Sequence, residues 1–544
     1  MFTAHRLTLP IPLFGFIALL VTLVPTTVQS QTYTDIHDFQ CAVDGCQPIN
    51  PGYLAQGRDG NLYGTTDHGG AADMGVIFRA TPDGVVTPIY SFTGPDGQNP
   101  DSGLIMGTDG NLYGTTDRGG ANNDGTVFKI TPAGVFTKLH DFTDADATPR
   151  GGVAQGKNGL FYGTTCSQFG PWTGYSISSA GKFKHLTNSI PPCPFSGIIL
   201  GTDGNFYGTS QVGGLTYQGT VFKMTPVGHV TILFSFDNSH GDYLYSPIVQ
   251  GNDGFLYGTT SGGGTGQGGV VFRMNTAGKK FSLLRQFDAS QGNDGSEPFA
   301  GLAAATDGNF YGATSGGANF GLVPNGDVFS ISSGGDYSDL FIFDSTHGIL
   351  AESTPMQHTN GMIYGLTVRG GPNLSQDGVL YRVDMALPSF VSLEERSGSA
   401  GQKVGILGTG LTAATGVKFG SGSATFTVLS DTYLTADVPA DGSAGFVTVS
   451  TPSGTLTSNR SFSLTPVVGS IAPTSGPVGT PVTITGSGFV GATQVTFSGK
   501  KAAYTVNSGS SITANVPAGA GTGKISVKTG GGSATSKAVF TVTP

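Results

Sequence analysis

Charged residues are scarce in this sequence of 544 residues, where Asp, Glu, Lys and Arg together make up 11%. Only four of them are glutamates, namely Glu297, Glu352, Glu394 and Glu395. A chain with so few long charged side chains has little from which to build amphipathic helices. Its 89 glycines, with abundant Thr, Ser, Val and Phe, suit short strands joined by tight turns. We therefore predict an all-β protein, and its length implies more than one hydrophobic core.

Positive charge is also in short supply. The chain carries 26 Lys and Arg against 35 Asp and Glu, and the basic residues form no cluster. Nucleic acids need cations that neutralise phosphates, and anionic membrane surfaces attract polybasic segments. The composition therefore predicts that neither is a partner.

Long apolar runs are absent except at the N-terminus, where residues 13–24 form a short apolar core after a basic start. Small residues then precede Gln31. This order is typical of a secretory signal peptide over residues 1–30, cleaved before Gln31. An uncleaved anchor is the alternative, but the apolar run is short for a membrane span. We expect a secreted or cell-surface protein that is not inserted in a membrane after cleavage.

The chain has only four cysteines, an even number that suits an exported protein with disulfides. Cys41 and Cys46 could close a small loop, and Cys166 and Cys193 lie within one sequence repeat. We predict disulfides Cys41–Cys46 and Cys166–Cys193, with four free thiols as the alternative. Zinc is not favoured, because neither pair has C-x-x-C spacing.

Internal repetition is the strongest signal in the chain. A Tyr-Gly pair recurs every 45 to 54 residues, at Tyr63, Tyr113, Tyr162, Tyr207, Tyr257, Tyr311 and Tyr364. Each unit holds four strand signals separated by an Asp-Gly turn, a glycine-rich loop and a Thr-Pro-x-Gly turn. Seven units of about 50 residues, each with four antiparallel strands, predict a seven-bladed β-propeller. A β-solenoid would need much shorter coils of chain.

The last unit has no fourth strand of its own. Its third strand is residues 379–383, and residues 33–39 at the front of the chain match the fourth strand at 138–142. We predict that strand 33–39 completes the seventh blade, so that the propeller spans residues 31–387 and has no open edge.

A second repeat, with a period of 78 residues, begins at Pro388. Val404 aligns with Val482, and Phe462 aligns with Phe540. Short alternating Val/Thr strands predict two immunoglobulin-like β-sandwich domains, at 388–465 and 467–543.

Residues Ile471 to Phe489 resemble the opening of an IPT/TIG domain, and the first copy departs from it where Ser392–Ser399 replaces the proline-containing start. In extracellular proteins this resemblance implies a spacer or an interaction module.

The seven repeats resemble the GloVer tandem repeat of choice-of-anchor bacterial surface proteins, over roughly residues 31–387. The resemblance implies a bacterial extracytoplasmic protein, often fitted with a C-terminal attachment device. It implies no catalytic residues.

The repeated acid before Gly is a turn residue and not a catalytic group. Asn replaces Asp twice in the series Asp59, Asp109, Asn158, Asp203, Asp253, Asp307 and Asn360. A turn accepts either residue, whereas a general acid or a charged calcium ligand does not. We predict no catalytic residue, metal or cofactor. A glycosidase would need two facing carboxylates, and we interpret Glu297 and Glu352 as solvated loop charges.

Variable loops occupy one end of the predicted blades, and such loops carry function. Exposed aromatic side chains in two of them would suit sugar rings. The candidate ligand-binding residues are Phe169, Trp172 and Tyr175 in one loop, and His240, Tyr243 and Tyr245 in the other. The alternative for Trp172 is local packing against a blade edge.

These patterns favour a non-catalytic binding or adhesion protein, in which propeller loops recognise an extracellular polysaccharide or a surface protein. The alternative is a secreted polysaccharide-active lyase or hydrolase on a propeller scaffold. A purely structural role is a third possibility.

Overall fold

The structure, a computed structural model, describes residues 31–48, 53–143, 148–166, 172–288, 295–316, 326–371 and 377–544. The predicted signal peptide, residues 1–30, lies outside them. The described chain is all-β, with one short 3-10 helix, η1 (Leu411–Ala413). Within this part of the chain no helix has the length and apolar character that crossing a membrane requires.

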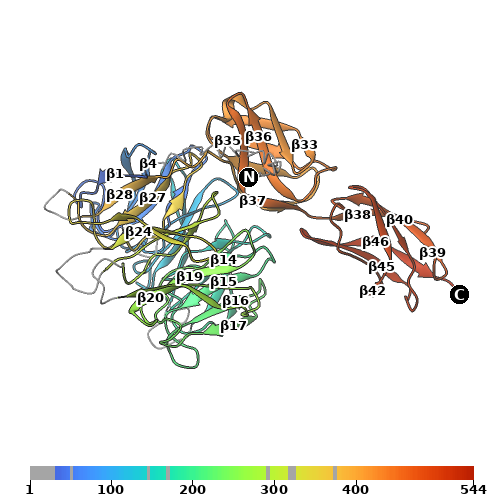
Figure 1. The fold of residues 1–544 in the computed structure, drawn as a ribbon, viewed down its shortest axis with the longest axis horizontal. Coiled ribbons are helices and arrows are strands. Elements are labelled where there is room, and N and C mark those ends of the chain that lie inside the picture. Colours follow the sequence, from blue (N-terminus) through green and yellow to red (C-terminus); the bar gives the residue numbers. More distant parts are fainter. Residues whose placement is uncertain are drawn as a thin grey trace, which may run out of the picture. The chain divides into compact units, whose positions relative to one another are not determined.

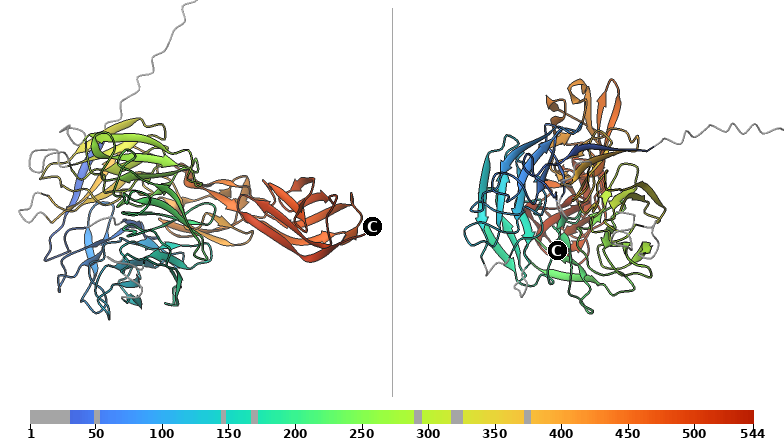
Figure 2. Two further views of the ribbon diagram at one scale, coloured as in Figure 1. Left: turned by 90° about the horizontal axis from the view of Figure 1, so that it is seen from below. Right: turned by 90° about the vertical axis from the view of Figure 1, so that its left-hand side faces the viewer.

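Seven four-stranded antiparallel sheets form the β-propeller, and the right-hand view of Figure 2 shows their strands arranged around a common centre. Blade 1 consists of β2 (Ala55–Gln56), β3 (Leu62–Thr66), β4 (Val76–Ala80) and β5 (Val86–Ser91). Blade 2 consists of β6 (Ile105–Met106), β7 (Leu112–Thr116), β8 (Thr126–Ile130) and β9 (Phe136–Asp141). Blade 3 consists of β10 (Ala154–Gln155), β11 (Phe161–Thr164), β12 (Gly174–Ile177) and β13 (Phe183–Thr187). Blade 4 consists of β14 (Ile199–Leu200), β15 (Phe206–Ser210), β16 (Thr220–Met224) and β17 (Val230–Ser235). Blade 5 consists of β18 (Val249–Gln250), β19 (Leu256–Thr260), β20 (Gln267–Met274) and β21 (Ser282–Asp288). Blade 6 consists of β22 (Ala303–Ala304), β23 (Phe310–Ala313), β24 (Asp327–Ile331) and β25 (Tyr337–Ile342).

Blade 7 is built from both ends of the propeller sequence. Its strands are β26 (Met356–Gln357), β27 (Ile363–Thr367), β28 (Val379–Asp384) and β1 (Thr32–Asp38). β1 pairs antiparallel with β28, and Figure 1 shows the two side by side. The Tyr33 ring also stacks on Phe341 of blade 6, with centroids 3.6 Å apart. The N-terminal strand thus closes the ring by hydrogen bonds and by aromatic packing.

The Tyr-Gly repeat is explained by the register of the second and third strands. In every blade its glycine lies opposite an aromatic residue, in the pairs Gly64–Phe78, Gly114–Phe128, Gly163–Tyr175, Gly208–Phe222, Gly258–Phe272, Gly312–Phe329 and Gly365–Tyr381. A Cβ atom at Gly64 would lie 2.5 Å from Phe78 Cζ, so only glycine leaves room for the ring. The repeat therefore marks the buried core of each blade.

The Asp-Gly turn fixes the tyrosine of the same repeat. Tyr63 Oη donates to Asp59 Oδ2 over 2.8 Å, and in the third blade Asn158 Nδ2 donates to Tyr162 Oη over 2.9 Å. Carboxylate and amide hold the same hydroxyl with opposite donor roles, which explains why Asp and Asn interchange. This geometry agrees with the prediction of a turn residue.

Two β-sandwiches follow the propeller and share one strand order. The first has sheets β29-β31-β35-β34 and β30-β37-β36-β32-β33, and the second has β38-β40-β44-β43 and β39-β46-β45-β41-β42. Strands of the first are β29 (Ser392–Leu393), β30 (Ser397–Gly398), β31 (Lys403–Leu407), β32 (Gly416–Phe419), β33 (Gly422–Ala424), β34 (Phe426–Ser430), β35 (Tyr433–Asp437), β36 (Gly445–Thr451) and β37 (Gly454–Leu464). Strands of the second are β38 (Val467–Ala472), β39 (Ser475–Gly476), β40 (Pro481–Ser487), β41 (Gln494–Phe497), β42 (Lys500–Lys501), β43 (Tyr504–Ser508), β44 (Ser511–Asn515), β45 (Gly523–Thr529) and β46 (Gly532–Val542). Figure 2 draws the first in orange and the second in red.

The first sandwich is hydrogen-bonded to the propeller at the end of the blades where the Asp-Gly turns lie. We call this end the turn face. Glu394 receives two hydrogen bonds from Arg58, Nε to Oε1 over 2.6 Å and Nη2 to Oε2 over 2.9 Å. The Arg58 guanidinium also lies 4.6 Å from the centre of the Tyr433 ring. In blade 7, the Phe390 N–H donates to the Thr359 carbonyl over 3.0 Å. The first sandwich therefore covers part of the turn face.

Candidate functional site

The opposite end of the blades, which we call the loop face, is organised by one hydrogen bond that recurs in all seven blades. A residue one or two positions after the second strand donates its backbone N–H to the carbonyl of a residue that precedes the first strand of the blade. We call this accepting residue the lead residue. The seven pairs, each with the donor first and the lead residue second, are Asp67–Gln47, Asp117–Asn99, Cys166–Thr148, Gln211–Cys193, Ser261–Tyr243, Ser315–Glu297 and Val368–Leu350. The repeated bond holds every lead residue at the same place in its blade.

Most lead residues have a left-handed backbone conformation although none of them is glycine. The φ angle lies between 51° and 59° at Gln47, Asn99, Cys193, Tyr243, Glu297 and Leu350. This region is uncommon for residues with a Cβ atom, and it persists only where the surrounding structure imposes it. The loop face is thus held in a rigid, energetically costly form, as binding sites often are.

Two residues after the lead residue, a side chain stands at the loop-face end of the central channel. These positions, which we call the ring residues, are Asp101, Arg150, Phe195, Tyr245, Phe299 and Glu352. Each precedes the innermost strand of its blade by four residues, and all six are partly exposed. The corresponding stretch of blade 1 lies outside the described residues.

Four of the ring residues, from four successive blades, form a continuous row. The Arg150 guanidinium lies 4.7 Å from the centre of the Phe195 ring. The Phe195 and Tyr245 rings meet edge-on at 5.5 Å, and Tyr245 lies 4.8 Å from Phe299. The Tyr245 hydroxyl accepts a hydrogen bond of 2.6 Å from Gln211 Nε2, which fixes the ring in place. The row offers aromatic surface together with polar groups, the usual make-up of a small-molecule site.

Acidic groups flank one end of this row. Arg150 Nε lies 3.2 Å from Asp117 Oδ1. Burial raises the pKa of Asp101 well above its usual range, and the nearby carboxylates of Asp67 and Asp117 add to the effect. Burial also raises the pKa of Asp117, while Arg150 opposes that rise. This end of the row can therefore both donate and accept hydrogen bonds at neutral pH.

Glu297 and Glu352 flank the other end, and here the prediction of solvated loop charges is wrong. Both residues are partly buried. Burial and the charge of Glu297 together raise the pKa of Glu352 to about 7, against an opposing effect of Arg369. Burial also raises the pKa of Glu297. The structure thus brings to one site the two carboxyl groups that the sequence analysis considered for acid–base chemistry.

A cavity of about 570 Å³ opens beside the row. It is lined by Asp117, Arg150, Phe195 and Gln211, and by the disulfide Cys166–Cys193. This disulfide joins the donor residue of blade 3 to the lead residue of blade 4. The prediction of this disulfide is confirmed, and its two cysteines form part of the wall of the candidate site.

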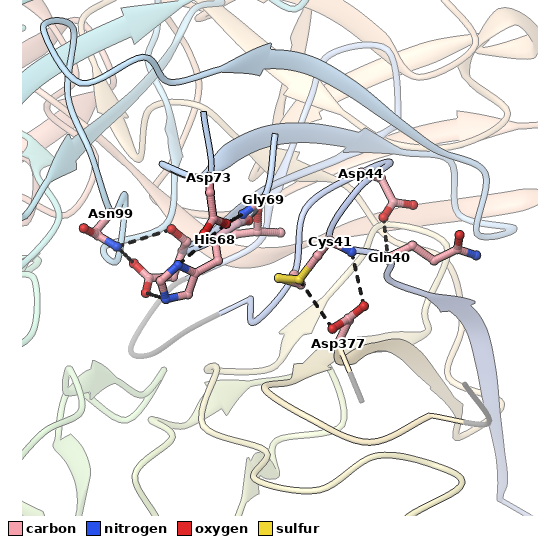
Figure 3. The surroundings of a disulfide bond; sticks show 11 residues. Gln40, Cys41, Asp44, His68, Gly69, Asp73, Asn99 and Asp377 are labelled. Carbon is pink, nitrogen blue, oxygen red and sulfur yellow. Dashed lines mark hydrogen bonds and ion pairs between the residues drawn. A yellow bond between two sulfur atoms is a disulfide. The ribbon is translucent and has the colours of Figure 1, made fainter. Parts of the chain in front are cut away.

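The second predicted disulfide, Cys41–Cys46, is also present. Figure 3 shows its surroundings, where the Cys41 N–H donates to Asp377 Oδ2 over 3.2 Å. Cys41, Cys46 and Asp377 lie close enough together to hold a metal ion as free ligands. Disulfide sulfurs are not thiolate ligands, so these three residues are not a metal site while the bond is intact.

The six predicted ligand-binding residues are not brought together. Phe169 lies outside the described residues. Trp172 is partly buried and packs against the hydrophobic cluster between blades 3 and 4. Tyr175 is fully buried opposite Gly163, so it packs the core and presents no surface to a ligand.

The other loop supplies one member of the row. Tyr245 is a ring residue, and Tyr243 is 45% exposed beside it. His240 bonds through Nδ1 to Asp237 Oδ1 over 2.7 Å and lies edge-on to Phe234. The same Asp–His arrangement recurs at Asp344 and His347 of another blade connection, which indicates a structural role for it.

Sequence analysis missed Arg150, Phe195 and Phe299. Each follows a lead residue and a proline, in Thr148-Pro-Arg150, Cys193-Pro-Phe195 and Glu297-Pro-Phe299. Aligning the repeats on this short X-Pro-X segment would have revealed a position that varies while its neighbours are kept.

Comparisons with known proteins place the chain among repeat proteins. A model described as the Gloeobacter/Verrucomicrobia repeat matches residues 20–188 and 194–429, and a model of the IPT/TIG domain matches residues 466–542. A search of curated proteins found no match.

Solved structures with some similarity include two lyases and a glycan-binding protein. A streptogramin B lyase is 14% identical, with a TM-score of 0.45 over 65% of this chain and 97% of its own. Virginiamycin B lyase from Staphylococcus aureus is 18% identical, with a TM-score of 0.44 over 65% and 98% of the two chains. A surface glycan-binding protein from Prevotella bryantii is 20% identical, with a TM-score of 0.21 over 27% and 38%. Similarity at this level does not assign an activity.

Proposed function

Because this chain belongs to the Gloeobacter/Verrucomicrobia repeat family, whose repeats form the propeller, we propose that it is a non-catalytic extracytoplasmic binding protein. Its ligand is a sugar unit of an extracellular polysaccharide, bound by the ring residues of the loop face. The two disulfides are consistent with an oxidising compartment outside the cytoplasm. The sandwich domains act as a spacer on the C-terminal side of the propeller.

One observation carries this proposal, namely the row formed by Arg150, Phe195, Tyr245 and Phe299. Sugars have apolar C–H faces and a rim of hydroxyl groups. Aromatic rings pack against the apolar faces, while carboxylates and amides form hydrogen bonds with the hydroxyl groups. The strained lead residues favour binding further, because a site fixed before the ligand arrives loses little conformational entropy.

The test is retention of the mature protein, from Gln31, on a panel of insoluble polysaccharides and cell-wall material. Tyr245→Ala and Phe299→Ala should each lower the affinity at least tenfold, because each removes an aromatic contact surface from the row. Tyr217→Ala is the matched control, since Tyr217 is 76% exposed and lies outside the row. Equal retention of all four proteins would place the binding surface elsewhere. Failure of the wild type on every material would leave a surface protein as the partner.

Glu352 favours a second candidate function, a polysaccharide lyase or hydrolase. A carboxyl group whose pKa is about 7 beside a second carboxyl group could act as a general acid. This candidate requires soluble sugar to be released from the bound polysaccharide, and it requires Glu352→Gln to abolish the release. Retention without any release would support the binding function.

A further inference from the structure

A second cavity, of about 910 Å³, lies at the other end of the central channel. Its walls are the innermost strands of blades 1 to 5 and the segment Ser392–Ser399 at the start of the first sandwich. Arg396 and Arg460 of that sandwich both line it. None of the ring residues of the loop face lines it, so this cavity is separate from the proposed sugar site.

Arg396 is an exposed residue whose side chain reaches into this cavity. Among the described residues its guanidinium has neither a hydrogen-bond acceptor nor an ion-pair partner, since only its carbonyl is used, by the Ser463 N–H. Surrounding protein atoms lower its pKa, because they displace the water that would stabilise the charge. A guanidinium with five donors therefore faces this cavity without an acceptor from the described chain.

Arg460 is the second cation of the cavity. Its Nη1 donates to Asn252 Oδ1 over 3.1 Å, which ties the side chain to an Asp-Gly turn of blade 5. Burial and the positive charge of Arg396 together lower the pKa of Arg460 to about 10, while the charge of Asp253 opposes them. The two guanidinium groups thus repel each other across the cavity.

The neighbouring acids do not neutralise this pair. Glu394 is engaged by Arg58 and by the Tyr433 hydroxyl. Glu395 lines the cavity, but burial and the charge of Glu394 raise its pKa, and no ion pair joins it to either arginine within the described chain. The cavity therefore has an excess of fixed positive charge and a free set of planar donors.

We infer that Arg396 and Arg460 form a binding site for an oxoanion, either a carboxylate or a sulfate group of a small ligand. Planar guanidinium groups match the spacing of carboxylate and sulfate oxygens and bind them through two parallel hydrogen bonds. Such an anion satisfies the free donors of Arg396 and removes the repulsion between the two arginines. The hydroxyl groups of Ser399 and Ser461, which also line the cavity, supply further donors.

The second sandwich contains a natural comparison. With the period of 78 residues, Arg396 corresponds to Thr474 and Arg460 to Ala538. The two arginines are thus absent from the copy that does not face the channel, although the fold of the two copies is the same. Formation of the sandwich does not require them.

The test measures binding of sodium sulfate and of sodium glucuronate to the full mature protein by calorimetry, at constant ionic strength made up with chloride. We expect saturable binding by the wild type, and at least a tenfold loss of affinity in Arg396→Gln and in Arg460→Gln. Arg396→Lys should retain part of the affinity. Arg382→Gln is the control, because Arg382 lies outside the cavity and pairs loosely with exposed Asp83. Binding of glucuronate alone identifies a carboxylate ligand, and binding of sulfate alone identifies a sulfated one.

Thermal unfolding separates this role from a structural one. Without an oxoanion, Arg396→Gln should melt at the same temperature as the wild type or higher, because it removes an unpaired charge. With saturating sulfate, the wild type should become the more stable protein. The inference is overturned if neither anion binds, or if both arginine variants bind as tightly as the wild type.

Discussion

The two sandwich domains have the same strand order but different roles. Their sequences align over 78 residues, and the same aromatic pair fills both cores. One of their differences is a short segment, where Glu394-Glu395-Arg396 stands in place of Ala472-Pro473-Thr474. In the first copy this segment bonds Arg58 of the propeller and lines the channel cavity. In the first copy, this segment supplies contacts to the propeller that the second copy lacks at the matching positions.

The largest expected effect tests whether the two cores are equivalent. Phe462 and Phe540 are both buried, and each meets a second Phe edge-on, at 4.8 Å and 5.3 Å. Replacing either with Ala should cost about 3 to 5 kcal/mol of local stability. Hydrogen exchange followed by mass spectrometry reports each domain separately, which suits a protein that does not unfold in one step.

The same pair of variants also tests the difference between the copies. Phe462→Ala should increase exchange at the turns around Arg58 and Thr359, because the first sandwich bonds both. Phe540→Ala should leave exchange in the propeller unchanged. Equal effects of the two variants on the propeller would remove the distinction that we draw.

The next effect concerns the contact itself. Glu394→Ala leaves the partly exposed Arg58 guanidinium without its carboxylate and should destabilise the interface by about 2 kcal/mol. Asp437→Ala, which removes the exposed pair with Lys403, should change stability little. Limited proteolysis of the segment around Pro388 measures the difference, and cleavage should be faster only in Glu394→Ala. Similar rates in both variants would mean that the Arg58 pair does not fasten the domain.

The smallest effect concerns Glu395, whose counterpart Pro473 carries no charge. Burial and the charge of Glu394 raise the pKa of Glu395 above its unfolded value, so the folded state binds the proton more tightly. Its contribution to stability therefore increases as pH falls through the folded pKa, and ionisation at neutral pH costs stability. Glu395→Gln should raise stability at pH 7 by less than about 1 kcal/mol, since the group is only half buried. At pH 3 the gain should vanish, and chemical unfolding at the two pH values measures it.

Most of the fold could be predicted from sequence because its determinants recur. Seven Tyr-Gly pairs mark seven identical strand registers. The sequence pattern that ends at Phe39 matches that of a fourth strand, so it predicts that the N-terminal strand completes the last blade. The departure of Ser392–Ser399 from the IPT/TIG pattern was visible as well. Its meaning was not, because nothing in the sequence says that Glu394 lies beside Arg58, 336 residues away.

The candidate site was harder to predict, because it is assembled from positions that vary. Tyr245 was identified by its aromatic side chain, whereas Phe195 and Phe299 gave no signal until blades were placed next to one another. Tyr175 was misinterpreted because its strand is shorter than the others, which hides its alignment with Phe78 and Phe128. Composition indicates aromatic loops, but only the blade geometry tells which rings meet.

The pairing of β1 with β28 also determines when the protein can finish folding. Asp38 pairs with Val379, so the first strand to be synthesised has no partner until about 340 further residues have been made. Contacts of such long range form late and slowly. Until then the strand is an open edge. Completion of the ring therefore waits for the last blade, which supplies the partner of the first strand.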